Sequence, residues 1–247
     1  MLPIDELYPI DKWALNKLNE LNKKVREGYD AYEFHQVYHA IHNFCVVDMS
    51  NFYLDVLKDR LYTEESDGKL RRAAQTAIYI ILDSMTRMIT PILAYTSDEI
   101  WKFMPHAEGV DASHVVYNSM PEPVEVNVDD EFIARWDKIH ELRDLVKKSI
   151  EVAVNEKLVK TSLETTIRLS CTGSEYDFVK SVEDELKDAF IVSGVEVVND
   201  ESAAEIKVEV NKAEGEKCER CWAYSVTVGQ DSDHPCVCAR CASVLKA

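Results

Sequence analysis

Apolar residues recur every three or four positions through most of the region before residue 156. This spacing places them on one face of a helix, the face that packs against a neighbouring helix in a bundle. The region is therefore predicted to be a set of amphipathic helices. They cover about residues 11–30, 32–61, 69–89, 96–103 and 129–155.

Short polar and proline signals set the expected ends and bends of these helices. Asp11 is the expected N-cap of the first helix, and Thr96–Glu99 matches the capping box that opens a helix. The second stretch is expected to kink near residues 48–51. The third helix should stop before Pro91, because proline cannot continue the hydrogen-bond ladder. Residues 105–128 hold several prolines and are expected to form an ordered loop.

Beyond residue 156 the pattern changes from helical spacing to alternation. Thr165–Cys171 alternates as a half-buried strand does. One helical pattern and two further strand patterns follow, over about residues 175–189, 191–198 and 206–210. These elements predict a small α+β unit.

Together the patterns predict a mainly α protein in three parts. Residues 1–156 form the expected helical bundle, and residues 157–212 form the small α+β domain. Residues 213–247 form the expected zinc-binding module, a zinc ribbon that contains two pairs of cysteines.

Four cysteines in two C-x-x-C pairs lie near the end of the chain, with sixteen residues between the pairs. A C-x-x-C turn aims two sulfurs at one point, and Zn²⁺ accepts four sulfurs tetrahedrally. One structural zinc ion is therefore the expected cofactor, with no open position for a substrate. The expected ligands are Cys218, Cys221, Cys238 and Cys241. Cys236 competes with Cys238 for one position, and the matching two-residue gap favours Cys238.

The charge of the chain limits its partners. The formal net charge of −17 argues against generic nucleic-acid binding, which needs many lysines and arginines. Residues 211–247 hold five basic and five acidic side chains, so the zinc segment is the least acidic part. Any contact with nucleic acid must therefore be local and dependent on shape.

Two residue types beside the cysteines are suited to RNA. Arg220 and Arg240 lie inside the two pairs, and Trp222 follows the first pair. An arginine and an exposed tryptophan on a metal-braced loop can bind phosphates and stack on unpaired bases. The alternative is that Trp222 packs over the metal site as its main hydrophobic residue.

Other polar clusters are weaker signals. His35, His39 and His42 share one helix face and could bind a metal, but a place at a helix–helix boundary is favoured. Basic clusters on predicted helices are either phosphate contacts or, more often, solvated helix faces. These clusters are Lys23, Lys24 and Arg26, then Lys69, Arg71 and Arg72, then Lys147 and Lys148.

The sequence contains no recognisable catalytic constellation. It lacks the glycine-rich phosphate loops and the G-x-S-x-G elbow. No apolar run reaches membrane-spanning length, and no secretory signal opens the chain. Seven cysteines, four of them in C-x-x-C pairs, suggest a reducing cytoplasm rather than a disulfide framework.

Longer stretches carry a family resemblance. They are Asp11–Trp13, Tyr38–Tyr62, Arg71–Thr76, Thr90–Trp101, Asn155–Glu164, Cys218–Trp222, His234–Pro235 and the second cysteine pair. Together they resemble the C-terminal part of bacterial isoleucyl-tRNA synthetases, across essentially the whole chain. The combination is specific, because the related valyl and leucyl enzymes are not expected to end in this ribbon.

The resemblance implies that the helical domain and zinc module grip the anticodon stem-loop of isoleucine tRNA. By motif position, Arg220 and Trp222 would face the anticodon. ATP binding and aminoacylation would belong to the catalytic domain of the same enzyme, whose His-x-Gly-His and Lys-Met-Ser-Lys-Ser motifs are absent here. The chain is thus expected to be a cytoplasmic fragment, inactive alone, with neither a membrane nor DNA as partner.

A different class of function stays open at this stage. The acidic surface also suits a stand-alone zinc-dependent protein-interaction module, which would be indifferent to tRNA. Arg220→Ala separates the two, since it should weaken tRNA binding only if the chain recognises tRNA.

Overall fold

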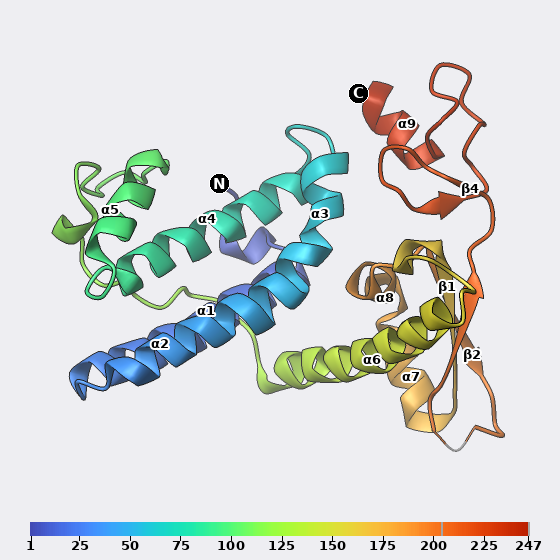
Figure 1. Ribbon diagram of the computed structural model, residues 1–247, viewed down its shortest axis with the longest axis horizontal. Helices are drawn as coiled ribbons and strands as arrows, with labels where there is room; N and C mark the ends of the chain where they lie inside the picture. The colour runs from blue at the N-terminus through green and yellow to red at the C-terminus, as the bar shows by residue number, and fades with distance from the viewer. Residues whose placement is uncertain (204, 247) are drawn as a thin grey trace. The chain divides into compact units, whose positions relative to one another are not determined.

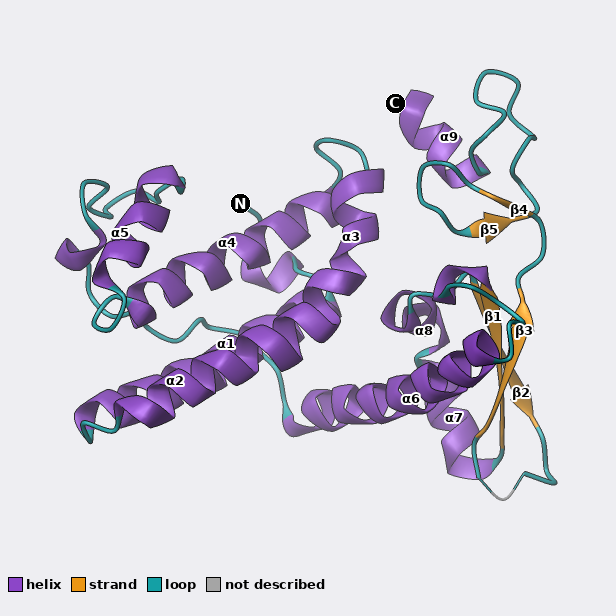
Figure 2. Ribbon diagram, viewed as in Figure 1, coloured by secondary structure: helices purple, strands orange, loops and turns teal. Residues whose placement is uncertain are grey.

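The structure is a computed structural model that describes residues 1–203 and 205–246. It is mainly helical, with two small sheets near the C-terminus (Figure 2), which confirms the predicted fold class. Contacts divide the chain into two compact units. The first holds residues 1–57 and 67–129, and the second holds residues 58–66 with the residues from 130 onward. Each unit is described by itself.

The first unit is built from packed helices (Figure 1). The longest, α1, packs against the other helices along an apolar face that includes Trp13, Leu18 and Val25, all buried. The helices are α1 (Pro9–Asp30), α2 (Phe34–Asn43), α4 (Lys69–Ile89) and α5 (Ala94–Phe103), with short 3₁₀ turns at Ile4–Glu6 and Val115–Tyr117.

Asp11 does not cap α1 as predicted. The helix begins at Pro9, so Asp11 lies within its first turn, where one carboxylate oxygen accepts the backbone N–H of Tyr8 at 3.3 Å. Its other oxygen accepts the hydroxyl of Tyr53 at 2.8 Å. Asp11 is fully buried, and these bonds satisfy a carboxylate that would otherwise be costly to bury.

The second predicted helical stretch contains a π-helical segment where a kink was expected. It consists of α2, the π-helical segment Phe44–Tyr53 and α3 (Leu54–Thr63). A π-helix adds a residue to each turn, which rotates the side chains that follow. Phe52 and Tyr53 are consecutive and both buried, and Phe52 meets Trp13 edge-on with ring centroids 5.1 Å apart.

The predicted capping box at Thr96–Glu99 is wrong. Helix α5 starts earlier, at Ala94, so these residues lie inside it. The helix α4 ends at Ile89, before Pro91, as predicted. The proline-containing loop after α5 is ordered through α1, because the Asn22 side chain donates to the carbonyl oxygen of Pro121 at 2.8 Å.

The second unit contains the long helix α6 and a three-stranded sheet. The strand order is β2–β1–β3, with β1 parallel to β2 and antiparallel to β3. The helix expected over residues 175–189 is two helices, because the backbone leaves helical geometry at the buried Val182. The elements are α6 (Asp130–Asn155), a 3₁₀ turn (Ser162–Glu164), β1 (Thr165–Cys171), α7 (Gly173–Ser181), α8 (Glu183–Phe190), β2 (Gly194–Asn199) and β3 (Lys207–Lys212).

The C-terminal module is small and contains one helix and a hairpin whose strands are two residues long each. These are β4 (Glu216–Lys217), β5 (Tyr224–Ser225) and α9 (Ala239–Lys246). The hydroxyl of Ser193 joins this module to the α+β part, since it accepts the backbone N–H of Tyr224 at 2.7 Å and donates to the carbonyl oxygen of Leu163 at 2.5 Å. Among the described residues, no helix has the length and apolar character needed to cross a bilayer.

Candidate metal centre and nucleic-acid interface

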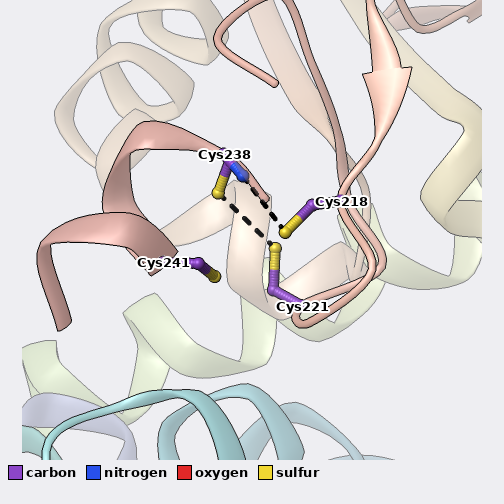
Figure 3. A group of neighbouring side chains, drawn as sticks. All are labelled: Cys218, Cys221, Cys238 and Cys241. Atoms are coloured by element: carbon purple, nitrogen blue, oxygen red, sulfur yellow. Dashed lines mark hydrogen bonds between the residues drawn. The ribbon is translucent and has the colours of Figure 1, made fainter. Parts of the chain in front are cut away.

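Four cysteine sulfurs from the two ends of the C-terminal module point toward one centre (Figure 3). Cys218 directly follows β4 and Cys221 lies in the turn before β5. Cys238 directly precedes α9, and Cys241 lies in its first turn. The four sulfurs lie within 4.8 Å of one another. The structure thus brings together all four predicted ligands.

The spacing of the sulfurs fits zinc. A tetrahedral ion with bonds of about 2.3 Å to sulfur separates its ligands by roughly 3.8 Å. The sulfurs of Cys221 and Cys238 are 3.9 Å apart. The backbone N–H of Cys238 also donates to the sulfur of Cys218 at 3.3 Å, as a donor to a thiolate ligand would. The site therefore has the donor set of a structural zinc ion.

The electrostatics of the thiols call for a cation. Burial opposes ionisation of Cys218, but backbone N–H donors, chiefly those of Cys221 and Cys238, outweigh it and lower its pKa to about 6. Burial raises the pKa values of Cys221 and Cys241, and neighbouring sulfur groups raise them further. Four thiolates cannot ionise around one point unless a positive ion compensates them, and a bound zinc ion supplies that charge.

Cys236 is outside the group. Its residue is exposed, and its carbonyl oxygen accepts the backbone N–H of Glu219 at 3.0 Å. This bond links the loop before Cys238 to the first cysteine pair. Cys236 thus bridges the two halves of the module through its backbone, while its thiol is not one of the clustered sulfurs.

The cysteines are themselves the core of the module. The buried cluster here consists of Cys218, Val237, Cys238, Cys241 and Ala242, with Cys221 and Val228 packed against it. So few apolar side chains cannot stabilise a domain of this size, and metal binding then supplies the folding free energy. The zinc ion is therefore structural.

Trp222 does not pack over the metal centre. The residue is 60% exposed, so the packing alternative is not the arrangement seen. Its backbone has φ of 66°, and its N–H donates to the carbonyl oxygen of Cys218 at 2.9 Å, which closes the first cysteine turn. The turn that holds two metal ligands therefore also fixes the backbone from which the indole projects.

Lys217 lies beside Trp222 and was not singled out from the sequence. Its ammonium nitrogen is 5.4 Å from the centroid of the indole ring. This cation–π contact places a positive charge next to an exposed aromatic face. No sequence signal pointed to Lys217, because the contact depends on the β4–β5 hairpin, which pairs Lys217 with Tyr224.

The two arginines in the cysteine pairs both contact the end of α3. Arg220 donates to the carbonyl oxygen of Thr63 at 2.6 Å. Arg240 forms an ion pair with Asp59, with nitrogen–oxygen distances of 2.5 and 2.7 Å. Burial opposes ionisation of Asp59, but the hydrogen bond and charge of Arg240, the Thr63 hydroxyl and the charge of Lys187 together outweigh it and hold the pKa of Asp59 below its usual value.

The other polar clusters do not form sites. His35, His39 and His42 are exposed, so the boundary expected for them is wrong. The ring of Tyr38 instead contacts His39 edge-on and His42 at a tilt. Within residues 1–203 and 205–246, the cysteine group is the only set of three or more potential ligands close enough to hold a metal.

Two members of the basic clusters have structural partners. Arg26 donates to the carbonyl oxygen of Pro121 at 2.6 Å and pairs with Glu122. Lys69 pairs with Glu6 at 2.9 Å. These contacts stabilise the helical unit, and they are neither phosphate contacts nor the purely solvated helix faces that were the expected alternative.

Comparison with known families decides the affiliation of the chain. Residues 11–169 match the family described as the anticodon-binding domain of tRNA ligase, which is more than half of the chain. The chain belongs to this family. Residues 215–244 of this anticodon-binding chain match a second family, the zinc finger found in FPG and IleRS. That match covers all four cysteines of the metal centre.

Curated relatives agree along the full length of this anticodon-binding chain. An isoleucine–tRNA ligase from Caldanaerobacter subterraneus subsp. tengcongensis is 44% identical over 100% of the chain. Isoleucine–tRNA ligases from Carboxydothermus hydrogenoformans and Bacillus mycoides are 47% and 43% identical over 99% and 98% of it. In each case the chain spans 27% of the length of the relative.

Proposed function

We propose that this chain recognises the anticodon stem-loop of isoleucine tRNA as part of an isoleucine–tRNA ligase. The family match supports tRNA as the ligand class, and the names of the relatives support isoleucine as the amino acid. Residues 1–156, 157–212 and 213–247 remain the domains that we propose for this task. Binding to the anticodon end positions the tRNA for a reaction elsewhere in the enzyme.

The exposed Trp222 is the observation that carries this proposal. Sequence-specific RNA recognition targets unpaired bases, which stack on aromatic side chains. An indole that is 60% exposed and fixed on a metal-braced turn is ordered before RNA arrives. Lys217, 5.4 Å from its ring, adds a charge suited to a neighbouring phosphate. We therefore place Trp222 and Lys217 at the contact with the anticodon loop.

We also place Arg220 at the contact with tRNA, although its side chain has a structural role as well. One of its amino groups is bound to the carbonyl oxygen of Thr63. Its remaining N–H groups and its positive charge are compatible with a phosphate beside Trp222. We expect Arg220 to contribute less to tRNA binding than Trp222, because part of its hydrogen-bonding capacity serves the protein.

The chemistry of aminoacylation is proposed to belong to the rest of the enzyme. ATP and isoleucine would bind the catalytic domain, which is the protein partner that we propose for this chain. The chain alone should then show no isoleucine-dependent ATP–pyrophosphate exchange. We place this activity in the cytoplasm, where the seven cysteines, all free of disulfides, remain reduced.

Two substitutions of Trp222 test the proposal through tRNA affinity. Trp222→Leu keeps an apolar side chain without a stacking surface, whereas Trp222→Phe keeps an aromatic ring. Both meet the same backbone strain at φ of 66°. Stacking of one base is worth roughly 1–3 kcal/mol. The leucine variant should therefore lose that much binding free energy for isoleucine tRNA, and the phenylalanine variant clearly less.

Equal affinities of the two variants and the unaltered chain would contradict the role of Trp222. If the unaltered, zinc-loaded chain shows no affinity for tRNA at low salt, the protein-interaction alternative gains support. The acidic net charge of −17 is the property that suits that alternative.

A further inference from the structure

The last carbonyl groups of helix α3 need hydrogen-bond donors from outside the helix. Residues 58–66, which complete α3 and begin the turn after it, belong to the same compact unit as the zinc module. The last carbonyl oxygens of any helix carry the negative end of its dipole and need donors from elsewhere. The zinc module supplies one, since Arg220 donates to the carbonyl oxygen of Thr63 at 2.6 Å.

Arg240 adds a second and more extensive contact with the same helix end. Its two amino nitrogens bind the two carboxylate oxygens of Asp59 at 2.5 and 2.7 Å. Paired N–H···O bonds of this kind fix both distance and orientation. The guanidinium also reaches the hydroxyl of Thr63 at 3.4 Å and the carboxylate of Glu64 at 3.7 Å.

The positions of the two arginines relate this contact to the metal centre. Arg220 lies between the two cysteines of the first pair, and Arg240 between those of the second. A zinc ion held by all four cysteines fixes both turns, and with them the backbone from which each arginine reaches α3. The contact with α3 is therefore built from the same two turns as the metal centre.

We propose that Arg220 and Arg240 form a clamp through which the zinc module holds residues 58–66, with Arg240 as the positioning residue that couples zinc binding to this contact. Zinc binding fixes the two cysteine turns, which places Arg220 toward Thr63 and Arg240 toward Asp59. In return, the ion pair with Asp59 stabilises the arrangement of the second turn that binds zinc, because coupling between two sites is reciprocal.

The test uses the whole chain, with zinc affinity and backbone amide exchange as the two readouts. Arg240→Gln removes the charge and the ion pair with Asp59 without touching a ligand. Coupling between two sites typically changes affinity by about 5- to 150-fold. We expect a decrease of this size in zinc affinity, measured by competition with a chelator. We also expect faster amide exchange in residues 58–66 while zinc is still bound.

Lys246→Gln is the matched control. Lys246 lies in the same helix, α9, loses the same charge, and pairs with Asp231 and Asp233 inside the module. This variant should leave the exchange of residues 58–66 unchanged. If Arg240→Gln and Lys246→Gln have the same effect on either readout, the clamp is refuted. Removing zinc from the unaltered chain must also speed exchange in residues 58–66, and no change there would refute the coupling.

A second variant keeps the test decisive if Arg240→Gln does not fold. Asp59→Asn leaves the zinc module intact and removes the negative charge and one of the two oxygens that accept from Arg240. The clamp predicts faster exchange in residues 58–66 together with a severalfold loss of zinc affinity. An unchanged zinc affinity in Asp59→Asn would overturn the coupling. Neither readout involves tRNA, so the outcome is independent of the function proposed above.

Discussion

At the scale of single residues, Lys217 and Trp222 differ in how directly the sequence pointed to them. Trp222 follows a cysteine pair and was predicted as an RNA contact. Its exposure excludes packing over the metal and leaves the indole available for stacking, and sequence alone does not determine exposure. Lys217 became visible only when the hairpin placed it 5.4 Å from the indole ring.

Lys217→Gln should weaken the binding of tRNA and reduce its dependence on salt. A lysine that neutralises one phosphate adds close to one unit to the slope of log affinity against log salt. The measurement is tRNA affinity at a series of salt concentrations. Lys246→Gln is the control in the same module, because its ammonium is already paired with Asp231. Parallel salt slopes for the unaltered chain and Lys217→Gln would argue against a phosphate contact.

Glu164 gives a prediction about pH. Its carboxylate accepts the backbone N–H of Lys160 at 2.7 Å and the hydroxyl of Tyr224 at 3.2 Å. The backbone N–H of Lys160, followed by the Tyr224 hydroxyl, holds the pKa of Glu164 below its usual value despite some desolvation. Such a group stabilises the fold above its unfolded-state pKa of about 4.3, and the contribution is lost as pH falls through the folded-state value.

Glu164→Gln should therefore destabilise the protein at pH 7 and make progressively less difference at more acidic pH. Chemical unfolding of both proteins at a series of pH values measures this. Tyr224→Phe is the companion variant, because it removes one donor and leaves the carboxylate charged. A stability difference for Glu164→Gln that stays constant from pH 7 to pH 3 would show that ionisation of Glu164 is not involved.

At the scale of elements, the sequence predicted helices well and their internal breaks poorly. The ends of α4 followed from periodicity and from Pro91, which are local signals. A kink was expected near residues 48–51, but neither the π-helical form of Phe44–Tyr53 nor the break at Val182 has such a signal. Both depend on which side chains the tertiary core accepts, since Phe52, Tyr53 and Val182 are buried. Helix α5 likewise begins at Ala94, before the capping pattern at Thr96–Glu99.

Gly215 is essential to the hairpin of the zinc module. It has φ of +85°, and a Cβ atom there would lie 2.2 Å from the backbone carbon of Ser225. Gly229 in the same module has φ of +86°, but its nearest atom would be 3.9 Å away. Both alanine variants carry backbone strain of roughly 1–2 kcal/mol. Only Gly215→Ala adds a clash with backbone that cannot move without opening the β4–β5 pairing.

Thermal unfolding in the presence of zinc compares the two alanine variants. Gly215→Ala should be clearly less stable than Gly229→Ala and should bind zinc more weakly, because the hairpin carries Cys218 and Cys221. Equal stabilities would mean that the backbone strain alone explains both variants, and that the close approach at Ser225 relaxes without cost.

At the scale of the whole molecule, the helical unit and the zinc module are stabilised by different kinds of core. The first unit is stabilised by buried helix faces, and the zinc module by four cysteines with few apolar neighbours. The sequence predicted both, because helical periodicity and C-x-x-C spacing are each read from a single segment. The contact of Arg220 and Arg240 with residues 58–66 was not predicted, since it joins segments more than 150 positions apart.

Removal of zinc should unfold the C-terminal module and leave most helices intact. The metal supplies the folding free energy of the module, whereas helices such as α1 and α4 are held by their own apolar contacts. Amide exchange with and without a chelator measures this. Protection should be lost across residues 215–244 and kept in α1 and α4. Full protection of residues 215–244 without zinc would show that the module folds by packing alone.

The most direct test of the central claim is the affinity of the zinc-loaded chain for isoleucine tRNA and for the same tRNA with an altered anticodon. Both should be measured at two salt concentrations, with zinc content quantified in the same sample. Recognition of the anticodon predicts tighter binding of the natural tRNA at both salt concentrations, with about one zinc ion per chain. Equal affinity for the two tRNAs, with zinc bound, would contradict it.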